Sequence, residues 1–351
     1  MACYHPLKGF KVGIHEKTGK ANYKIVPYET DHLELYPDGV WRPVFDSFHS
    51  ALARDWTDSE DFVQIPCGQC IGCRLDYSRQ WANRCLMELE YHKESWFITL
   101  TYDDAHVPWS ECIHPETGEI TQHQTLRKKD FQDFMKRLRK NYSVKYPDAD
   151  KLRFYACGEY GSQTFRPHFH AIIFGLHLDD LVFYGRNAQG DMLYNSEFIS
   201  DCWHHNGYDV IGQVTWESCA YVARYIMKKL KGDQSEFYEL NNIVPEFTLM
   251  SRRPGIAYQW YEDHPDIYEY DLITLKTPKG GKLIKPPRYF DKLYDIDDPV
   301  DMAKIKAYRE SFAKQDILEK LKHTSYNYLE MLQAEEDHKK ASIKALQRRL
   351  D

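Results

Sequence analysis

The strongest constraint on the fold comes from two strand-like segments joined by a short loop. The first, residues 153–161, reads RFYACGEYG, and the second, residues 166–174, reads RPHFHAIIF. Gly, Ser and Pro punctuate the loop, as they do in connections between strands. If the two segments fold back as a hairpin, Glu159 lies opposite His168, where cross-strand side chains are close neighbours. The pattern therefore predicts paired antiparallel strands with a polar site between them.

Two histidines in this hairpin form a candidate metal site. Side chains alternate between the two faces of a strand, so His168 and His170 point to the same face. Two imidazoles and one carboxylate suit Mg²⁺, Mn²⁺ or another divalent ion that keeps open coordination positions. The alternative is a pair of exposed histidines on an ordinary strand. We predict that His168, His170 and Glu159 are the metal ligands.

A later segment adds a pair of tyrosines. Residues 216–232 read WESCAYVARYIMKKLKG and predict a helix, because a threonine can cap its start and a glycine can end it. Tyr221 and Tyr225 are four residues apart and would share one face of this helix. Such a pair usually packs in a core or an interface. Beside a bound cation, however, a tyrosine hydroxyl can attack a phosphodiester, and a nearby lysine can stabilise the charge.

These motifs resemble those of the HUH endonucleases that start rolling-circle replication. The likeness rests on the histidine pair and on the two tyrosines, with a lysine three residues after the second one. Residues 96–102, WFITLTY, match the first motif of that family. Residues 67–73, CGQCIGC, are similar to microvirus initiators of the gokushovirus branch. The two-tyrosine form is typical of initiators of small single-stranded DNA phages.

The resemblance implies a nicking and joining reaction at a replication origin. The metal ion would pull on the scissile phosphate, and one of the tyrosines would attack it. The products would be a 5′-phosphotyrosyl bond and a free 3′-hydroxyl, and the second tyrosine would allow the displaced strand to be rejoined into a circle. The implied catalytic residues are Tyr221, Tyr225, Lys228 and Lys229.

The resemblance also implies partners. The protein would bind single-stranded DNA and supercoiled origin DNA, and a host DNA polymerase would extend the 3′-hydroxyl. The sequence contains no Gly-x-x-x-x-Gly-Lys phosphate loop, so a host helicase or supercoiling would have to separate the strands. Two alternative functions stay open: a plasmid or transposon nickase with the same chemistry, and a catalytically inactive, metal-stabilised DNA-binding protein.

The charge distribution is unusual for a protein that binds nucleic acid. The net charge is −7, whereas such proteins are usually basic. Acidic residues concentrate in residues 29–61, and residues 127–140 form a basic, helical stretch. Alone, such a stretch usually marks a solvated face, but beside a phosphodiester-cutting site it predicts contacts to the DNA backbone. The predicted contacts are Arg127, Lys128, Lys129, Lys136, Arg137, Arg139 and Lys140.

The chain has nine cysteines and neither a secretory signal nor an apolar run long enough to cross a membrane. We therefore expect reduced thiols and a location in the cytoplasm of the bacterial host. Cys67, Cys70 and Cys73 supply three thiolates in a Gly-rich turn. A structural Zn²⁺ needs four ligands, and Cys3 or Cys85 could supply the fourth. The alternative is three reduced thiols without a metal.

The order of elements predicts an α+β fold, with helices packed on a central antiparallel β-sheet of the HUH type. An irregular, Cys-rich amino-terminal region and a helical carboxy-terminal region would flank this core. The predicted boundaries are residues 1–90, 91–235 and 236–351. The expected elements are a helix at 74–93, strands at 96–102 and 208–215, a helix at 126–142 and amphipathic helices within 298–350, with a polar loop after the first strand.

Overall fold

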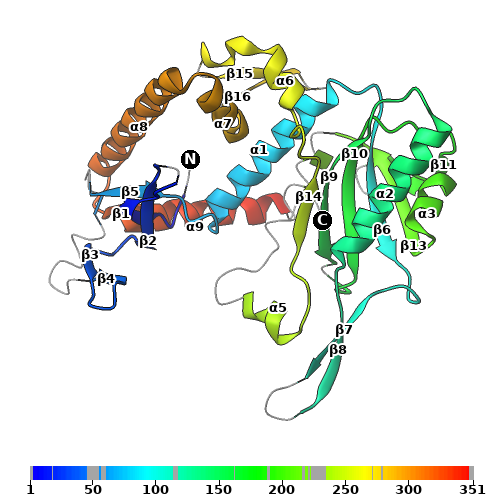
Figure 1. The fold of residues 1–351 in the computed structure, drawn as a ribbon, viewed down its shortest axis with the longest axis horizontal. Coiled ribbons are helices and arrows are strands. Elements are labelled where there is room, and N and C mark those ends of the chain that lie inside the picture. The colour runs from blue at the N-terminus through cyan, green and yellow to red at the C-terminus, as the bar shows by residue number, and fades with distance from the viewer. Residues whose placement is uncertain are drawn as a thin grey trace. The chain divides into compact units, whose positions relative to one another are not determined.

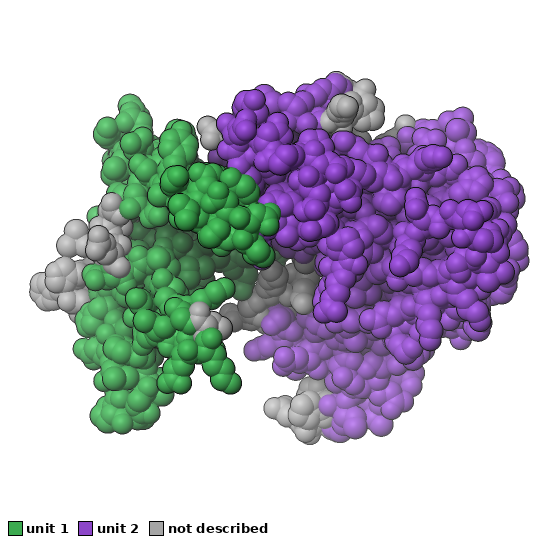
Figure 2. Space-filling view, turned by 45° about the horizontal axis from the view of Figure 1, so that its top comes forward, with its two compact units in different colours: residues 1–76, 294–351 green, residues 77–293 purple. Residues whose placement is uncertain are grey.

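The computed structural model of the chain describes residues 3–17, 19–45, 55–56, 61–113, 118–161, 163–187, 190–215, 218–219, 222, 235–270, 272–277 and 280–347. These residues fall into two compact units, coloured in Figure 2. Unit 1 combines Met1–Asp76 with Tyr294–Asp351, and unit 2 is Tyr77–Leu293. The three-part division at residues 90 and 235 stays a prediction. Among the described helices, none is long and apolar enough to cross a membrane.

Unit 2 is built on an antiparallel sheet that has seven strands within the described residues (Figure 1). Its strand order is β11-β12-β13-β6-β10-β9-β14. The predicted α+β class and central antiparallel sheet are confirmed. The strands are β6 (Ser95–Tyr102), β9 (Arg153–Tyr160), β10 (Pro167–Phe174), β11 (Val182–Arg186), β12 (Met192–Asn195), β13 (Gly207–Gln213) and β14 (Phe247–Met250).

The predicted hairpin occupies the middle of this sheet. Strands β9 and β10 pair with Glu159 opposite His168, so the predicted register is confirmed. On the other side of β10, strand β6 places Thr99 opposite His170. The alternation of side chains then gives β10 two different faces. One face carries Phe169, Ala171 and Ile173, and the other carries His168, His170, Ile172 and Phe174.

Two helices cover the face that carries Phe169. They are α2 (Lys128–Lys145) and α3 (Glu197–Trp203), which lie side by side in Figure 1. The apolar residues of α2 recur at helical spacing, and Phe131 and Phe134 pack with Phe169 and Trp203. Burying one such phenylalanine contributes about 2–3 kcal/mol. This packing fixes the strands that carry the histidines.

The opposite face, which carries the histidines, packs against other segments. Helix α1 (Ile71–Leu89) contributes Ala82 and Cys85 to this second core. Cys219 and Val222, which are fully buried, join them. These residues pack with apolar side chains of the sheet and with Ile256; the strand residues are Tyr155, Cys157, Ile172 and Phe174.

The remaining elements of unit 2 include a long hairpin that the sequence did not predict. Strands β7 (Trp109–Ile113) and β8 (Ile120–Gln124) pair where we expected a polar loop, and Figure 1 shows them extending away from the sheet. Trp109, Ile113 and Ile120 are exposed, so neither face of the hairpin is covered enough to give a strong alternation signal. The other elements are α5 (Glu236–Leu240), α6 (Tyr258–Asp263), η4 (Pro265–Tyr268), β15 (Ile273–Thr277), β16 (Gly280–Ile284) and α7 (Arg288–Asp297), which runs past the end of the unit.

Unit 1 contains strands where we expected irregular chain, so that expectation was wrong. Its described residues form a three-stranded sheet, β2-β1-β5, and a separate hairpin of β3 and β4. Most side chains of these strands are exposed or half-buried, so their hydrophobic pattern is weak. The predicted carboxy-terminal helices are confirmed, and Tyr328 and Leu332 pack against Tyr28. The elements are β1 (Leu7–Ile14), β2 (Ala21–Pro27), β3 (His32–Leu35), β4 (Trp41–Val44), β5 (Phe62–Ile65), α8 (Pro299–Lys322) and α9 (Tyr328–Gln347).

Candidate metal site on the central strands

Glu159 and the two histidines bring their ligand atoms to one point. Oε1 of Glu159 lies 2.7 Å from Nε2 of His168 and 3.2 Å from Nε2 of His170. The register explains this convergence, because Glu159 lies directly opposite His168 and diagonally opposite His170. We refer to Glu159, His168 and His170 as the triad. The structure therefore brings together all three predicted metal ligands.

Each histidine ring is held by its other nitrogen. Nδ1 of His168 donates a hydrogen bond to the backbone carbonyl of Arg166 over 3.0 Å, and Nδ1 of His170 shares a hydrogen bond of 2.9 Å with the hydroxyl of Thr99. A carbonyl can only accept, so in neutral His168 the lone pair lies on Nε2 and faces a carboxylate oxygen. Only a shared proton or a cation makes that contact favourable. Metal-binding histidines are commonly oriented through their second nitrogen in this way.

The electrostatics of the triad favour an ionised carboxylate. Burial alone would raise the pKa of Glu159, but the hydrogen bonds and charges of His168 and His170 outweigh it and lower the pKa to about 2. Glu159 is 2% exposed, and the side chain of His168 is 15% exposed. A buried carboxylate that stays charged needs cationic partners. The more exposed His168 marks the side from which solvent can reach the triad.

The donor set fits a hard or borderline divalent ion. One carboxylate oxygen and two imidazole nitrogens suit Mg²⁺, Mn²⁺ or a similar ion, and three protein ligands leave positions for water or for a phosphate oxygen. Phe97 of β6 stacks on His170 and limits the movement of its ring. The arrangement is thus suited to holding a Lewis acid beside an incoming phosphodiester.

The predicted catalytic residues Tyr221, Tyr225, Lys228 and Lys229 lie outside the described residues. Two residues of the same segment, Cys219 and Val222, are described and helical. Both are buried in the core on the triad-bearing face of the sheet, together with Ile172 of β10. The segment that carries the tyrosines is therefore anchored on the same face as the metal ligands.

The structure does not bring the basic stretch to the triad. The predicted DNA contacts lie on α2 or directly before it, and α2 packs on the face of the sheet opposite the triad. Two of these residues hold backbone groups: Arg137 donates to the carbonyl of Cys202 and Arg139 to that of Leu152. Both guanidinium groups therefore help to fix the fold.

The other basic residues of this stretch have exposed side chains. Lys129 pairs with Asp133 one turn along α2, at 2.5 Å, and Lys128 lies over the ring of Phe247. An exposed pair of this kind contributes little to stability, so its lysine stays available to a stronger anionic partner. Contacts of this surface with DNA stay a prediction; the residues concerned are Arg127, Lys128, Lys129, Lys136 and Lys140.

The cysteine prediction is resolved in favour of Cys3. The sulfur atoms of Cys3, Cys67, Cys70 and Cys73 lie within 4.8 Å of one another. Cys85, the alternative fourth ligand, lies elsewhere, in the core beneath the triad-bearing face. The four-cysteine group belongs to unit 1 and is thus a second candidate metal site, separate from the triad.

Sequence reasoning missed two residues that orient the triad. Thr99 holds His170, and Arg166 donates to the carbonyl of Tyr102 over 2.7 Å while pairing with Asp104. Alternation along residues 96–102 places Thr99 on the face opposite Leu100, but the identity of the neighbouring strand was needed to connect it with His170. The position of Arg166, directly before the histidine strand, was the available signal for the second residue.

Comparison with known proteins places these features in a family. The sequence model of the phage replication-associated protein ORF2 family matches residues 95–230, which include the triad and both tyrosines. Replication-associated protein ORF2 of Spiroplasma virus 4 is 33% identical over 289 residues, covering 82% of this chain and 85% of the relative. The chain belongs to this family of phage replication-associated proteins.

Two further relatives of this replication-associated protein also come from phages. Replication-associated protein VP4 of Bdellovibrio phage phiMH2K is 32% identical over 238 residues, covering 67% of this chain and 69% of the relative. Replication-associated protein ORF4 of Chlamydia phage 1 is 31% identical over 259 residues, covering 70% of this chain and 58% of the relative. No solved structure matches the chain. The resemblance to gokushovirus-like microvirus proteins is therefore confirmed.

Proposed function

We propose that this replication-associated protein is an HUH-type, two-tyrosine DNA nicking and joining enzyme that initiates rolling-circle replication. The observation that carries the proposal is the triad, in which two imidazoles and a carboxylate converge with their second nitrogens already engaged. A divalent ion held there would act as a Lewis acid on the scissile phosphate. Binding of DNA without chemistry would not require such a site.

The reaction we propose conserves phosphodiester bonds. The phenolic oxygen of Tyr225 or Tyr221 attacks the phosphorus, a tyrosyl–phosphate bond forms, and the bond to the 3′-oxygen breaks. The proton lost by the tyrosine is balanced by the one gained by the leaving 3′-hydroxyl. One bond replaces another of similar energy, so the step needs no ATP. The free 3′-hydroxyl would then prime a host polymerase.

Two tyrosines would let the reaction run again after one round of synthesis. The second tyrosine would cut the regenerated origin, and the 3′-hydroxyl released by that cut would attack the first tyrosyl–phosphate bond and close a circle. Lys228 and Lys229 would stabilise negative charge on the phosphate or on the phenolate. The anchoring of Cys219 and Val222 on the triad-bearing face supports delivery of the neighbouring tyrosines to the triad.

The proposed substrates are supercoiled origin DNA and single-stranded DNA. The exposed lysines of α2 would contact the DNA backbone, and a host helicase would separate the strands ahead of the polymerase. Since α2 covers the opposite face of the sheet, a strand that touches both must pass around an edge of the sheet.

The test is metal-dependent nicking of the supercoiled phage genome that carries this gene. The purified protein should convert it to nicked circles with Mn²⁺ or Mg²⁺, and EDTA should abolish the activity. His170→Ala should lower nicking at least 100-fold while DNA binding persists, because one ligand is lost. His205→Ala, a change at an exposed histidine, is the matched control. Binding without nicking under every divalent ion would instead support an inactive DNA-binding protein.

A further inference from the structure

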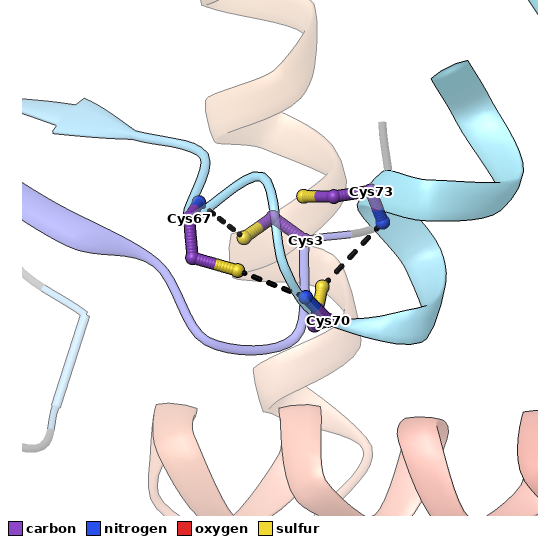
Figure 3. A group of neighbouring side chains, drawn as sticks. All are labelled: Cys3, Cys67, Cys70 and Cys73. Carbon is purple, nitrogen blue, oxygen red and sulfur yellow. Dashed lines mark hydrogen bonds between the residues drawn. The ribbon is translucent and has the colours of Figure 1, made fainter. Parts of the chain in front are cut away.

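The four-cysteine group lies where three separate pieces of unit 1 meet. Cys3 precedes β1, Cys67 and Cys70 lie in the turn between β5 and α1, and Cys73 belongs to the first turn of α1. Figure 3 shows the four side chains directed toward one another. Their sulfur atoms lie within 4.8 Å of one another, although Cys3 is 64 residues from its nearest partner in sequence.

Backbone amides surround the sulfur atoms. Among the described residues, five N–H groups donate to them over 3.3–3.5 Å. Those of Gln69 and Cys70 donate to Cys67, those of Tyr4 and Cys73 donate to Cys70, and that of Cys67 donates to Cys3. Amide donors stabilise thiolates far more than neutral thiols. The turn can present them because Gly68 adopts a φ of +71°, in the region that favours glycine.

Further positive potential acts on the group. Cys70 directly precedes α1, and its carbonyl accepts the first helical hydrogen bond, from Arg74 over 3.0 Å. The sulfur atoms therefore lie at the positive end of a 19-residue helix. Lys340 of α9 interacts electrostatically with Cys70. All of these features favour a cluster of negative sulfur atoms.

We propose that Cys3, Cys67, Cys70 and Cys73 bind one Zn²⁺ ion in a closed, tetrahedral, structural site. In a tetrahedron with zinc–sulfur bonds of about 2.3 Å, the sulfur atoms are about 3.8 Å apart. The observed limit of 4.8 Å matches a single ion, whereas a cluster of several irons would spread the sulfur atoms further. Two disulfides would need the sulfur atoms to approach in pairs, and the bacterial cytoplasm would reduce them.

The site would be structural because the protein supplies every ligand. Cys70 and Cys73 are buried, and the buried Tyr4 packs against them. No position remains for water or substrate, so the ion takes no part in DNA cleavage. It would fasten the start of β1 to the start of α1. Unit 1 needs such a connection because its described strands cover little of their own apolar surface.

The experiment measures zinc and iron per chain by mass spectrometry in the full-length protein. After brief washing with EDTA, the unaltered protein should hold about one zinc ion per chain. Cys70→Ser should lose it, and Cys112→Ser, a change at a cysteine of the β7–β8 hairpin, should retain it. His170→Ala should also retain it, which separates this site from the triad.

A second measurement does not depend on how the variants fold. Replacing zinc by Co²⁺ in the unaltered protein should produce thiolate-to-cobalt charge-transfer absorption and the visible bands of a tetrahedral site. A mercurial reagent should release zinc as four thiols react. Less than about 0.2 zinc per chain, or iron with acid-labile sulfide, would overturn the proposal. Zinc that survives Cys70→Ser but disappears with His170→Ala would overturn it as well.

Discussion

The triad owes its geometry to second contacts that each histidine makes. Arg166 and Thr99 engage the Nδ1 atoms, so both Nε2 atoms face Glu159. A carboxylate in this position is buried yet ionised, with its pKa lowered to about 2 by the two histidines against the effect of burial. Orientation and charge are therefore supplied before any substrate arrives, which lowers the cost of organising the site during reaction.

The first prediction concerns Thr99, which positions His170. Thr99→Val removes the hydroxyl that shares a hydrogen bond with Nδ1 of His170 and keeps the shape of the side chain. We expect affinity for Mn²⁺ to fall about 10-fold to 100-fold, because losses of such supporting contacts have effects of that size. Mn²⁺ titration followed by calorimetry measures it.

Thr121→Val is the control for this change. The hydroxyl of Thr121 also lies beside a histidine ring, that of His123, at 3.1 Å, but on the β7–β8 hairpin. It should leave Mn²⁺ affinity unchanged. Equal effects of the two variants would show that the bond between Thr99 and His170 does not support metal binding.

The second prediction concerns a buried charge outside the triad. Glu88 of α1 accepts hydrogen bonds from the guanidinium of Arg153 and from the backbone N–H of Ala257, and interacts with His92. Burial alone would raise its pKa, but these partners outweigh burial and lower it below 4.5. Glu88→Gln should lower the free energy of unfolding by about 3 kcal/mol at pH 7, because Arg153 loses its charged partner.

The pH dependence gives this prediction its sign. Because the pKa of Glu88 is lowered on folding, its contribution is complete above pH 4.5 and is lost as the pH falls toward its folded value. The difference between Glu88→Gln and the unaltered protein should therefore shrink in acid, as urea unfolding at several pH values would measure. Glu90→Gln, at an exposed neighbour, should have little effect at any pH. A difference that grows in acid would contradict the assignment.

At the scale of elements, the strand pairing was predictable where the sequence supplies both faces of a buried sheet. Residues 153–174 alternate strongly and contain a short Gly/Ser/Pro loop, so the hairpin and its register followed from the pattern. The β7–β8 hairpin and the strands of unit 1 were not predictable, because their faces are largely exposed. The metal ligands followed from the hairpin, but their supporting residues required the order of strands across the sheet.

The third prediction concerns the junction of β13 with β6. Gly207 pairs with Tyr102 at a φ of +151°, and a Cβ there would lie 2.1 Å from the carbonyl oxygen of Thr101. Gly207→Ala should therefore lower the free energy of unfolding by about 3 kcal/mol or more. Because Thr101 lies opposite His168, metal affinity should fall as well.

Gly212→Ala in the same strand is the matched control. Its Cβ would meet Leu193 at 3.5 Å, an ordinary contact, so a loss below about 1 kcal/mol is expected. Chemical unfolding of both variants measures the difference. Similar stability of the two would mean that the close approach at Gly207 is not limiting.

At the scale of the whole molecule, two tasks fall to different parts of the chain. Unit 2 holds the triad, and unit 1 holds the four cysteines; α1 begins in unit 1 and continues into unit 2, where Ala82 and Cys85 pack on the triad-bearing face. The net charge of −7 requires that DNA be bound by local basic surfaces and not by overall attraction. The exposed lysines of α2 are the surface we predicted for this purpose.

The fourth prediction tests that surface through its salt dependence. Changing Lys136 and Lys140 together to glutamine should weaken binding of single-stranded DNA. The slope of log affinity against log salt should fall by about 1.4, since each phosphate contact accounts for about 0.7. Changing Lys304 and Lys314 of α8 to glutamine is the charge-matched control. Fluorescence anisotropy at several salt concentrations measures both variants, and an unchanged slope for the first would remove α2 from the DNA-binding surface.

The central claim is that a tyrosine of this chain becomes covalently joined to DNA beside the metal bound by the triad. The most direct measurement incubates the protein with the supercoiled phage genome and Mn²⁺, digests the products and identifies the modified peptide by mass spectrometry. We predict a nucleotide attached through a 5′-phosphate to Tyr221 or Tyr225, absent with EDTA and with Glu159→Gln. Nicked circles without any protein adduct would contradict this account, because water would then be the nucleophile.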